Sequence, residues 1–248
     1  MERSVIVSGG GTGIGRATAR RFVLAGDAVT IIGRREAVLV AAATELNGEA
    51  GTDAVRTLVG DLSDPAEVER LAAAILADGR LIDVVVNNAG GVGAATDAGL
   101  AAVAADWEGE LRRNVLPGVL LTEALQTGLR RPGASVVNVS SIAALAGGGD
   151  SYSGAKAALL GWTLDLAVRS GRDGVRVNAV VPGFIEDTEF FGDRMTDDRR
   201  QRLVDRTLLG RAGTPDDVAS CIYFLASDGA SYVTGQLLHV NGGALLGR

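Results

Sequence analysis

A tyrosine and a lysine stand four residues apart in the segment Tyr152-Ser153-Gly154-Ala155-Lys156. On a helix this spacing places both side chains on one face, so the ammonium of Lys156 is expected beside the phenol of Tyr152. A nearby positive charge favours the phenolate, which predicts a pKa of Tyr152 below its ordinary value of about 10. Such a tyrosine suits general acid/base catalysis at a carbonyl or alcohol oxygen. A solvated helix face without a chemical role is the competing interpretation.

Two hydroxyl side chains precede that pair. The run Ser135–Val139 is typical of a buried strand, and Ser140 and Ser141 come directly after it. Ligands of open α/β sheets bind at the carboxyl ends of the strands. Ser141 is therefore expected to hold a substrate oxygen, with Ser140 as its rival for that role. Ordinary turn chemistry is the alternative.

A glycine-rich turn occupies residues 8–15, between the first expected strand and a helix-like segment. Glycines at such a junction let the backbone approach a pyrophosphate, and the helix N-terminus supplies free N–H groups with a partial positive charge. A plain tight turn is the alternative. The pattern predicts a dinucleotide site that includes Gly9, Thr12, Gly13, Ile14 and Gly15.

The second expected strand ends in Gly33-Arg34-Arg35. A carboxylate at this position would hold the adenosine ribose of NAD, and glycine cannot do so. Arg34 and Arg35 can instead pair with a 2′-phosphate through forked, charge-assisted hydrogen bonds. NADP is therefore the expected cofactor, with NAD as the alternative. Two arginines on a solvated loop are the interpretation without a ligand.

The composition narrows the classes of function. The chain has 248 residues, 47% of them hydrophobic and 22% charged, so it can bury a substantial core. A net charge of −6 offers no field for collecting a phosphate backbone, which argues against nucleic acid as a partner. Ala37–Ala43, which no purely apolar stretch exceeds in length, is far short of the roughly 20 residues of a membrane helix. With no secretory pattern before the first strand, a cytoplasmic protein without membrane contact is expected.

Cysteine and histidine are each present once, as Cys221 and His239. One thiol cannot form an internal disulfide framework, and these two residues cannot build a multi-thiolate or His-rich metal site. No metal is therefore expected, and both residues are expected to have structural roles only.

Short β-branched runs alternate with longer Ala- and Leu-rich amphipathic segments, which predicts repeated βαβ units. Runs that are apolar at consecutive positions are typical of parallel strands covered on both faces. We expect one α/β domain over residues 1–248, a doubly wound parallel sheet of the Rossmann type between two helical layers. Strands are expected at Val5–Val7, Val29–Ile32, Ala54–Val59, Ile82–Val86, Ser135–Val139, Val175–Val180 and Leu237–Val240.

Helical apolar spacing joins these strands. The stretch from Gly183 to Gly213 contains no expected strand, and its mixed charge and aromatic residues predict a substrate lid at about 184–210. The last two expected helices are apolar over more surface than one buried face requires, so they are expected at a subunit interface. Helices are expected at Ala17–Ala25, Ala37–Leu46, Pro65–Ala77, Trp107–Leu129 and Tyr152–Val168.

Taken together, these residues resemble the short-chain dehydrogenase/reductase family in its compact form. The resemblance covers the whole chain and adds several motifs to the glycine turn, Ser141 and the Tyr152–Lys156 pair. These are Asp61 after the third strand, Asn87-Asn88-Ala89-Gly90, Asn114, Asn178-Ala179-Val180-Val181-Pro182-Gly183, Gly210-Arg211-Ala212-Gly213 and Asn241-Gly242-Gly243.

The resemblance implies a role for each matched position. Tyr152 would transfer the proton, Lys156 would lower its pKa and bind the nicotinamide ribose, Ser141 would orient the carbonyl, and Asn114 would hold a water of a proton relay. Pro117 is expected to kink the helix beside Asn114 and so free backbone groups for that water.

On the cofactor side, the resemblance implies contacts along the whole dinucleotide. Asp61 would contact the adenine, with Leu62 beside it in the binding set. The ribose side would meet Asn88, Ala89 and Gly90, and the nicotinamide carboxamide would rest near Pro182, Gly183 and Ile185.

The sequence also departs from the family pattern. Ser8 replaces the usual threonine, and the interval from Ser141 to Tyr152 is a couple of residues short. Asp187 occupies the usual threonine position near the nicotinamide, with Thr188 one residue later.

The expected function is NADP(H)-dependent hydride transfer between nicotinamide and a carbonyl or secondary alcohol, with Tyr152 as general acid/base. The pattern is most similar to the branch that acts on 3-oxoacyl thioesters, which makes such a thioester, or another ketone, the expected substrate.

Family resemblance implies a homotetramer or homodimer. A basic patch of Arg130, Arg131, Arg169 and Arg172 could receive an acidic carrier protein, with solvated surface arginines as the alternative. A catalytically silent dinucleotide sensor or scaffold is the competing function.

Overall fold

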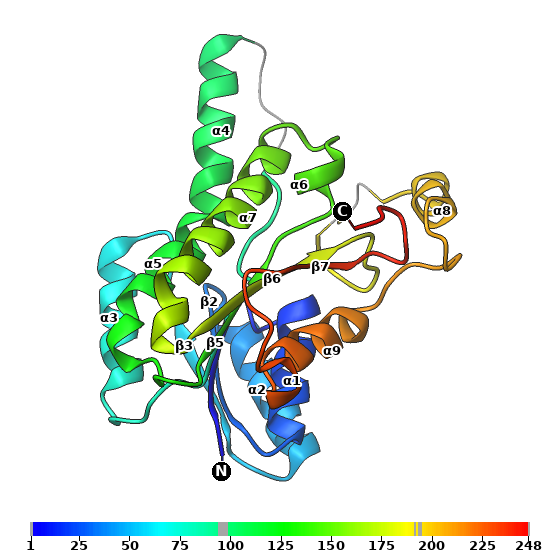
Figure 1. Ribbon diagram of the computed structural model, residues 1–248. Coiled ribbons are helices and arrows are strands. Elements are labelled where there is room, and N and C mark those ends of the chain that lie inside the picture. Colours follow the sequence, from blue (N-terminus) through cyan, green and yellow to red (C-terminus); the bar gives the residue numbers. More distant parts are fainter. Residues whose placement is uncertain (1, 94–98, 191, 193–194, 248) are drawn as a thin grey trace.

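The computed structural model describes residues 2–93, 99–190, 192 and 195–247. Seven parallel strands form one sheet in the order β3-β2-β1-β4-β5-β6-β7, as predicted for a doubly wound fold. Figure 1 shows this sheet at the centre of the molecule with helices on either side. The strands are β1 Ser4–Ser8, β2 Ala28–Gly33, β3 Val55–Val59, β4 Val84–Asn87, β5 Ser135–Val139, β6 Arg176–Pro182 and β7 Leu237–Val240.

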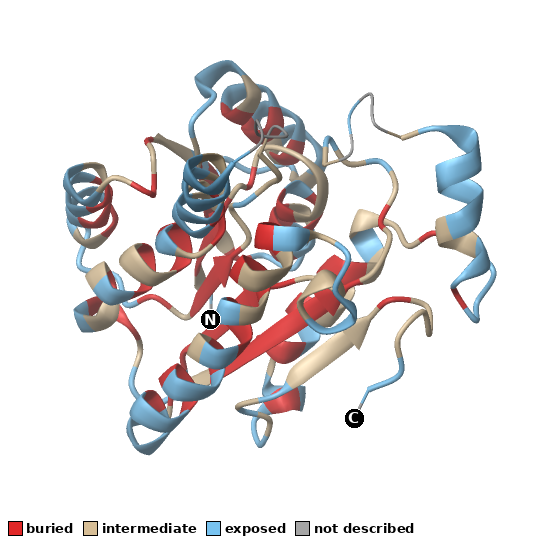
Figure 2. Ribbon diagram, turned by 90° about the horizontal axis from the view of Figure 1, so that it is seen from above, coloured by how far each residue is buried: buried red, intermediate tan, exposed pale blue. Residues whose placement is uncertain are grey.

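Two helical layers cover the sheet. On one face lie α1 (Gly13–Leu24), α2 (Glu36–Ala50) and α9 (Pro215–Leu225), and their apolar side chains form one buried cluster with the strands. On the other face lie α3 (Pro65–Leu76), α5 (Leu116–Ala124) and α7 (Asp150–Ser170), which form a second cluster. Figure 2 shows the consequence, because the central strands and the inner helix faces are buried while the outer helix faces are exposed, and the edge strand β7 is partly buried.

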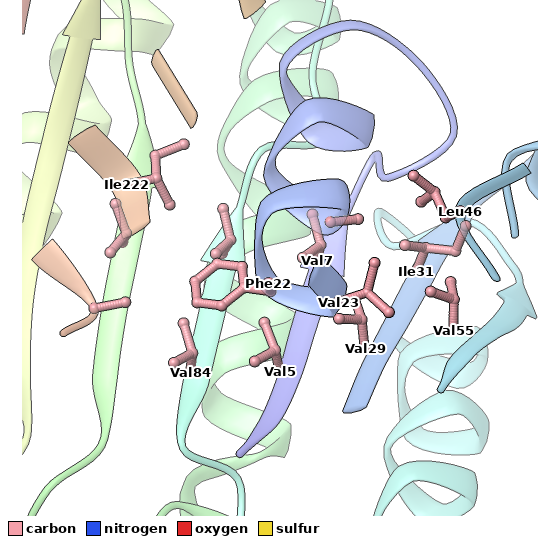
Figure 3. Close-up of a cluster of buried hydrophobic side chains, with 14 of the residues drawn as sticks. Val5, Val7, Phe22, Val23, Val29, Ile31, Leu46, Val55, Val84 and Ile222 are labelled. Carbon is pink, nitrogen blue, oxygen red and sulfur yellow. The ribbon is translucent and has the colours of Figure 1, made fainter. Parts of the chain in front are cut away.

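The packing of the first cluster follows from the sequence pattern. Val5 and Val7 of β1 point toward Phe22 and Val23 of α1, as Figure 3 shows. All four side chains are at most 3% exposed. Burying side chains of this size contributes about 1.5–3 kcal/mol each, so the apolar spacing of α1 fixes that helix against β1.

All seven predicted strands are confirmed, with ends that differ by at most two residues. The single helix predicted over Trp107–Leu129 is wrong. Instead α4 (Leu100–Asn114) ends one residue before Val115, and α5 follows with Pro117 in its first turn. The physical reason is that proline has no N–H for the carbonyl of Arg113. The predicted kink beside Asn114 is therefore a break between two helices.

Three α-helices of the described chain lie outside the predicted ranges, and one of them is α9, which follows the lid segment. The short helix α6 (Ala143–Ala146) follows Ser141, and α8 (Asp197–Asp205) lies within the expected lid segment. The hydroxyl of Thr196 accepts a hydrogen bond from the backbone N–H of Arg199, and two aspartates occupy the first turn of α8. This N-cap signal was present in the sequence. In Figure 1, α4 and α8 both extend away from the sheet.

The first and fourth strands meet at the point where the order of connection reverses. The hydroxyl of Ser8, fully buried at the end of β1, accepts hydrogen bonds from the backbone N–H groups of Asn88 (2.9 Å) and Ala89 (3.0 Å). It also donates to the carbonyl of Val86. Ser8 thereby ties the carboxyl ends of β1 and β4 together, at the edge where open α/β sheets bind ligands.

A membrane-spanning helix would have to be longer and more apolar than any helix in the part of the chain that the structure describes.

Alanine at Gly15 is expected to destabilise the protein. A Cβ at this position of α1 would lie 2.1 Å from the carbonyl oxygen of Gly9, and this backbone atom cannot move aside without distorting the turn. We expect Gly15→Ala to lower the free energy of unfolding by about 1–3 kcal/mol, measured by urea denaturation. Gly48→Ala is the matched control, because Gly48 also lies in a helix and has open space around its Cβ position. The control should gain up to about 1 kcal/mol. Equal effects at the two glycines would contradict the close packing at Gly15.

Candidate active site

A groove of about 730 Å³ runs over the carboxyl ends of β1, β2, β3 and β4. The glycine turn forms its floor. Gly9 and Gly13 have positive φ angles of 65° and 50°, which glycine adopts readily and other residues rarely do. Thr12 begins α1 without a side-chain hydrogen bond to the first turn. The backbone N–H groups in the first turn of α1, which the Thr12 side chain does not cap, therefore face the groove, as anion binding requires.

One end of the groove lies between basic and acidic side chains. Arg34 lines it beside Asp61 and Leu62. The carboxylate of Asp61 accepts hydrogen bonds from the backbone N–H (2.9 Å) and hydroxyl (2.8 Å) of Ser63. The backbone bond in particular lowers the pKa of Asp61, and the charges of Arg34 and Arg112 act in the same direction. Asp61 is thus held ionised, with Arg34 close by.

Arg35 lines the same groove, and its guanidinium is paired across it. Its Nη2 lies 2.6 Å from a carboxylate oxygen of Glu189, which belongs to the predicted lid segment. Both side chains are more than half exposed, so the pair contributes at most about 1 kcal/mol. Within the described ranges, Arg34 has no ion-pair partner, so its charge is the more available of the two.

A second cavity of about 470 Å³ adjoins the groove, and both are lined by Gly90, Val92, Thr188 and Phe190. Its wall is mainly apolar, from the segment after β5, α6 and the lid segment. Tyr152, Ser141 and Lys156 also line it. The sheet edge thus brings the predicted catalytic side chains together next to the groove.

Ser141 and Ser140 have different surroundings. A hydrogen bond joins the side chains of Ser141 and Tyr152. The hydroxyl of Ser140 is buried and donates to the backbone carbonyl of Lys156 at 2.8 Å. The Ser141 hydroxyl accepts a hydrogen bond from the backbone N–H of Ala143 at 3.2 Å and is only partly buried. Because Ser140 is buried and donates its hydroxyl proton to a backbone carbonyl, the geometry favours Ser141 for contact with a ligand.

Lys156 lies one helical turn after Tyr152 on α7, with its Nζ 5.8 Å from the centre of the Tyr152 ring. The ammonium donates a hydrogen bond to the carbonyl of Val139 on β5 at 3.1 Å, and the side chain is 5% exposed. The spacing prediction is confirmed, because the two side chains share one face of α7 and one cavity.

The predicted direction of the Tyr152 pKa is wrong for the protein without a ligand. Burial of the phenol raises the pKa of Tyr152 to about 12, against the opposing hydrogen bond with Ser141. Burial also lowers the pKa of Lys156 to about 8. Desolvation disfavours the charged form of both groups, and it is the largest cause of each shift.

Asn114 lies behind the cavity and does not line it. Its Oδ1 accepts a hydrogen bond from the backbone N–H of Gly91 at 3.0 Å, and its Nδ2 donates to the carbonyl of Gly91 at 2.9 Å. A Cβ at Gly90 would lie 2.6 Å from the Asn114 Oδ1 and 3.3 Å from the Lys156 Nζ. Asn114 is therefore close to Lys156, as the relay prediction requires, and the relay itself stays a prediction.

Sequence reasoning missed Glu110, which is 2% exposed and hydrogen-bonded to the amide of Asn114 at 2.6 Å. The helix around Glu110 mixes apolar and charged residues, so nothing in its sequence pattern indicates that this one carboxylate is buried. A second missed signal was available, because Lys156 is the only lysine in the chain and arginine supplies every other cationic side chain apart from His239. Only lysine offers a compact, titratable ammonium, which distinguishes position 156 from all others.

Asp187 and Thr188 take different sides of the lid segment. Asp187 is exposed and has a φ of 57°, a left-handed conformation that is uncommon for residues other than glycine. Thr188 lines both cavities, and its Cγ2 would lie 3.3 Å from a Cβ at Gly13. The turn at Asp187 thus places Thr188 over the glycine turn and keeps the carboxylate outside.

Most of the predicted site residues line one of the two cavities. Asn114 and Gly15 line neither, and Gly15 instead permits close packing of α1 on the turn. The groove is lined by Gly9, Thr12, Gly13, Arg34, Arg35, Asp61, Leu62, Asn88, Ala89 and Gly90. The second cavity is lined by Gly90, Ile14, Ser141, Tyr152, Lys156, Pro182, Gly183 and Ile185.

The predicted basic patch is largely neutralised within the molecule. Arg130 is paired with Asp83, Arg131 with Asp173, and Arg169 with both Glu123 and Asp165. These pairs favour the interpretation as solvated surface arginines.

Known proteins are similar to this chain in both sequence and fold. A family model described as enoyl-(acyl carrier protein) reductase matches residues 9–244. A short-chain type dehydrogenase/reductase from Mycobacterium ulcerans superposes with a TM-score of 0.90 at 31% identity, covering 98% of this chain and 90% of that one. The chain belongs to the short-chain dehydrogenase/reductase family. A second member, from Burkholderia thailandensis, is 37% identical with a TM-score of 0.85, covering 100% of this chain and 94% of that one.

Curated relatives extend over nearly the whole chain. A subunit of (2S)-[(R)-hydroxy(phenyl)methyl]succinyl-CoA dehydrogenase from Thauera aromatica is 35% identical over 248 residues, 99% of this chain and 98% of the relative. The 3-oxoacyl-[acyl-carrier-protein] reductase FabG of Aquifex aeolicus is also 35% identical, over 96% of this chain and 95% of the relative. Membership of the short-chain dehydrogenase/reductase family makes the chain an oxidoreductase of CH–OH and carbonyl groups with a nicotinamide dinucleotide cofactor.

The residues present fit that cofactor. A side chain at Gly9 would lie 2.8 Å from the Asn88 Nδ2 and 3.1 Å from the Ala89 Cα, so the floor of the groove has space only for backbone. The free N-terminus of α1 suits the pyrophosphate of a dinucleotide. The groove and the adjoining cavity together have the size of an extended ligand followed by a small substrate.

The lowered pKa of Lys156 predicts a pH dependence of stability. An unfolded lysine holds its proton up to its ordinary pKa of 10.5, and the folded protein releases it above about pH 8. Between these values the unfolded state binds more protons, so the free energy of unfolding rises with pH. Urea denaturation from pH 7 to 10 should show the stability of the wild type rising relative to Lys156→Met, by up to about 1.4 kcal/mol per pH unit above pH 8. A difference that is constant over this range would contradict the burial of an ionisable Lys156.

Proposed function

We propose that this protein is an NADP(H)-dependent reductase that moves a hydride between the nicotinamide and a carbonyl or secondary alcohol. The observation that carries the proposal is the meeting of Ser141, Tyr152 and Lys156 in one cavity that adjoins the dinucleotide groove. A carbonyl compound in that cavity would lie between the hydroxyl groups of Ser141 and Tyr152 on one side and the nicotinamide end of the groove on the other. The bound cofactor supplies or accepts the hydride.

In the reductive direction, the phenol of Tyr152 donates its proton to the carbonyl oxygen as the alkoxide forms. The high pKa of Tyr152 keeps the phenol protonated, so that it can act as the proton donor. Ser141 holds the same oxygen by a hydrogen bond and opposes the rise in the pKa of Tyr152. Lys156 binds the nicotinamide ribose and, as an ammonium, stabilises the phenolate that remains. Asn114 connects Lys156 to the proton relay.

Arg34 supports NADP as the cofactor. It lies at the end of β2, lines the groove beside Asp61 and is exposed, so it can receive a 2′-phosphate. Arg35 can contribute a second contact once its guanidinium leaves Glu189. NAD is the alternative, and it would make no use of either charge.

A 3-oxoacyl thioester is the proposed substrate class, with another ketone as the alternative. The names of both curated relatives include an acyl thioester carrier, coenzyme A in one and acyl carrier protein in the other. The cavity wall is apolar, with Ile142, Phe184 and Leu203 among its residues, and Arg199 and Arg206 stand at the α8 side. Such a wall suits an acyl chain.

The segment 184–210 is proposed as a substrate lid over this single catalytic domain. The ring of Phe190 lies 5.5 Å from the ring of Tyr152, and α8 extends over the cavity from outside. A homotetramer or homodimer through α4, α5 and α7 stays a prediction, supported by Trp107, Leu164 and Val168, which are exposed on these helices. A cytoplasmic location also stays a prediction.

Phenylalanine at Tyr152 tests the chemistry directly. Tyr152→Phe removes the proton donor and keeps the ring, so turnover of 3-oxoacyl thioesters with NADPH should fall by at least about 100-fold. NADPH binding, followed by nicotinamide fluorescence, should change little. Cofactor binding without turnover of any compound by the wild type would favour the silent sensor or scaffold instead.

Alanine at Arg34 tests the choice of cofactor. A charge-assisted hydrogen bond to phosphate contributes about 1.5–3 kcal/mol to binding, so Arg34→Ala should weaken NADPH binding by about 10-fold or more. NADH has no 2′-phosphate, so its binding should remain nearly unchanged. Arg172→Ala is the matched control, because Arg172 is exposed, lines neither cavity and should bind NADPH as the wild type does. If the wild type binds NADH more tightly than NADPH, the NADP proposal is wrong.

A further inference from the structure

We propose that Glu110 is a positioning residue that holds Asn114 and the turn at residues 91–93 against Lys156 and supplies the negative charge that faces its ammonium. The inference deepens the proposed function, since the catalytic use of Lys156 rests on it. Its test, however, needs neither cofactor nor substrate.

The hydrogen bonds of Glu110 use both carboxylate oxygens. Its Oε1 accepts from the backbone N–H of Gly93 at 2.6 Å and from the Arg113 Nη1 at 2.6 Å. Its Oε2 accepts from the Asn114 Nδ2 at 2.6 Å. All three partners are donors, so only a group that accepts at both oxygens satisfies them. A glutamine would direct its own N–H₂ group at one of these donors.

These contacts lead directly to Lys156. Asn114, fixed by Glu110, binds both backbone groups of Gly91, and Gly90 lies between the Asn114 Oδ1 and the Lys156 Nζ. Glu110 therefore sets the position of the backbone that separates α4 from the ammonium. Gly90 and Val92 of this backbone line both cavities.

The charge of Glu110 also acts on Lys156. The ionisable groups around Lys156 in the described chain are Tyr152 on its own helix and Glu110 on α4, with Arg113 paired to Glu110 on the outer side. From β5, Lys156 meets only the neutral carbonyl of Val139. Glu110 raises the pKa of Lys156 against the larger effect of burial. Without that charge, more of the enzyme would hold a neutral amine at working pH.

The chain offers an unusually direct measurement, because Lys156 is its only lysine. Labelling with [13Cε]lysine gives one lysine resonance, whose chemical shift reports the protonation of Lys156 as the pH changes. In the wild type we expect a pKa near 8. Glu110→Gln should lower this value by about one pH unit, as expected for loss of a partly screened charge nearby. Glu108→Gln, an exposed glutamate two residues away on α4, is the matched control and should titrate as the wild type does.

A second variant changes the titration in the opposite direction. Arg113→Gln removes the cation that neutralises Glu110, so the pKa of Lys156 should rise. Arg113 is partly exposed, which makes the variant tolerable for the fold even where Glu110→Gln does not fold. A Lys156 pKa unchanged in Arg113→Gln, or in folded Glu110→Gln, would overturn the electrostatic role.

The positioning role has its own measurement. Amide hydrogen exchange of Gly91 and Gly93 should accelerate at least 10-fold in Glu110→Gln and remain unchanged in Glu108→Gln, while the amides of β5 keep their protection. Equal acceleration throughout the sheet would show general destabilisation and overturn the role. All of these results are obtained on the ligand-free protein, so they stand apart from any failure of the NADPH assays.

Discussion

The reversal of strand order between β1 and β4 is the constraint on which the rest of this structure depends. The connection after one of these strands leads to one side of the sheet, and the connection after the other leads to the opposite side. A crevice therefore opens between them at the carboxyl ends of the strands. The Ser8 hydroxyl closes the base of this crevice by accepting two backbone hydrogen bonds from the segment after β4. The glycine turn, Asp61 and the segment from Asn88 to Gly90 all come to the same edge because each follows a strand of this sheet.

Burial gives the adjoining cavity its chemistry. The same apolar packing that holds α7 on the sheet removes Tyr152 and Lys156 from water, which makes the phenol a weaker acid and the ammonium a stronger one. The phenol therefore resists ionisation until a ligand changes its surroundings, whereas Lys156 loses its proton only above about pH 8. Polar neighbours then become important, because few groups remain to compensate a buried charge, and Glu110 of α4, which is hydrogen-bonded to Asn114, is one of them.

Much of the fold could be predicted from the sequence, since apolar runs of β-branched residues identify buried strands regardless of their partners. The site was predictable where a local signal existed, as for the glycine turn and the Tyr152–Lys156 spacing. Prediction failed where the outcome depends on tertiary contacts. The burial of Glu110, the pairing of Arg35 with Glu189 and the raised pKa of Tyr152 all arise from segments distant in sequence. The break at Val115 was underestimated because Pro117 permits either a kink or two helices.

We propose that the groove and the adjoining cavity form one site for a nicotinamide dinucleotide and a carbonyl substrate. A crystal structure of the protein with NADPH would decide whether they do. We expect the adenine end beside Asp61 and Arg34, the pyrophosphate at the N-terminus of α1, and the nicotinamide ring within reach of Tyr152 and Lys156. A nicotinamide ring bound away from Tyr152, or no NADPH in the groove at saturating concentration, would contradict it.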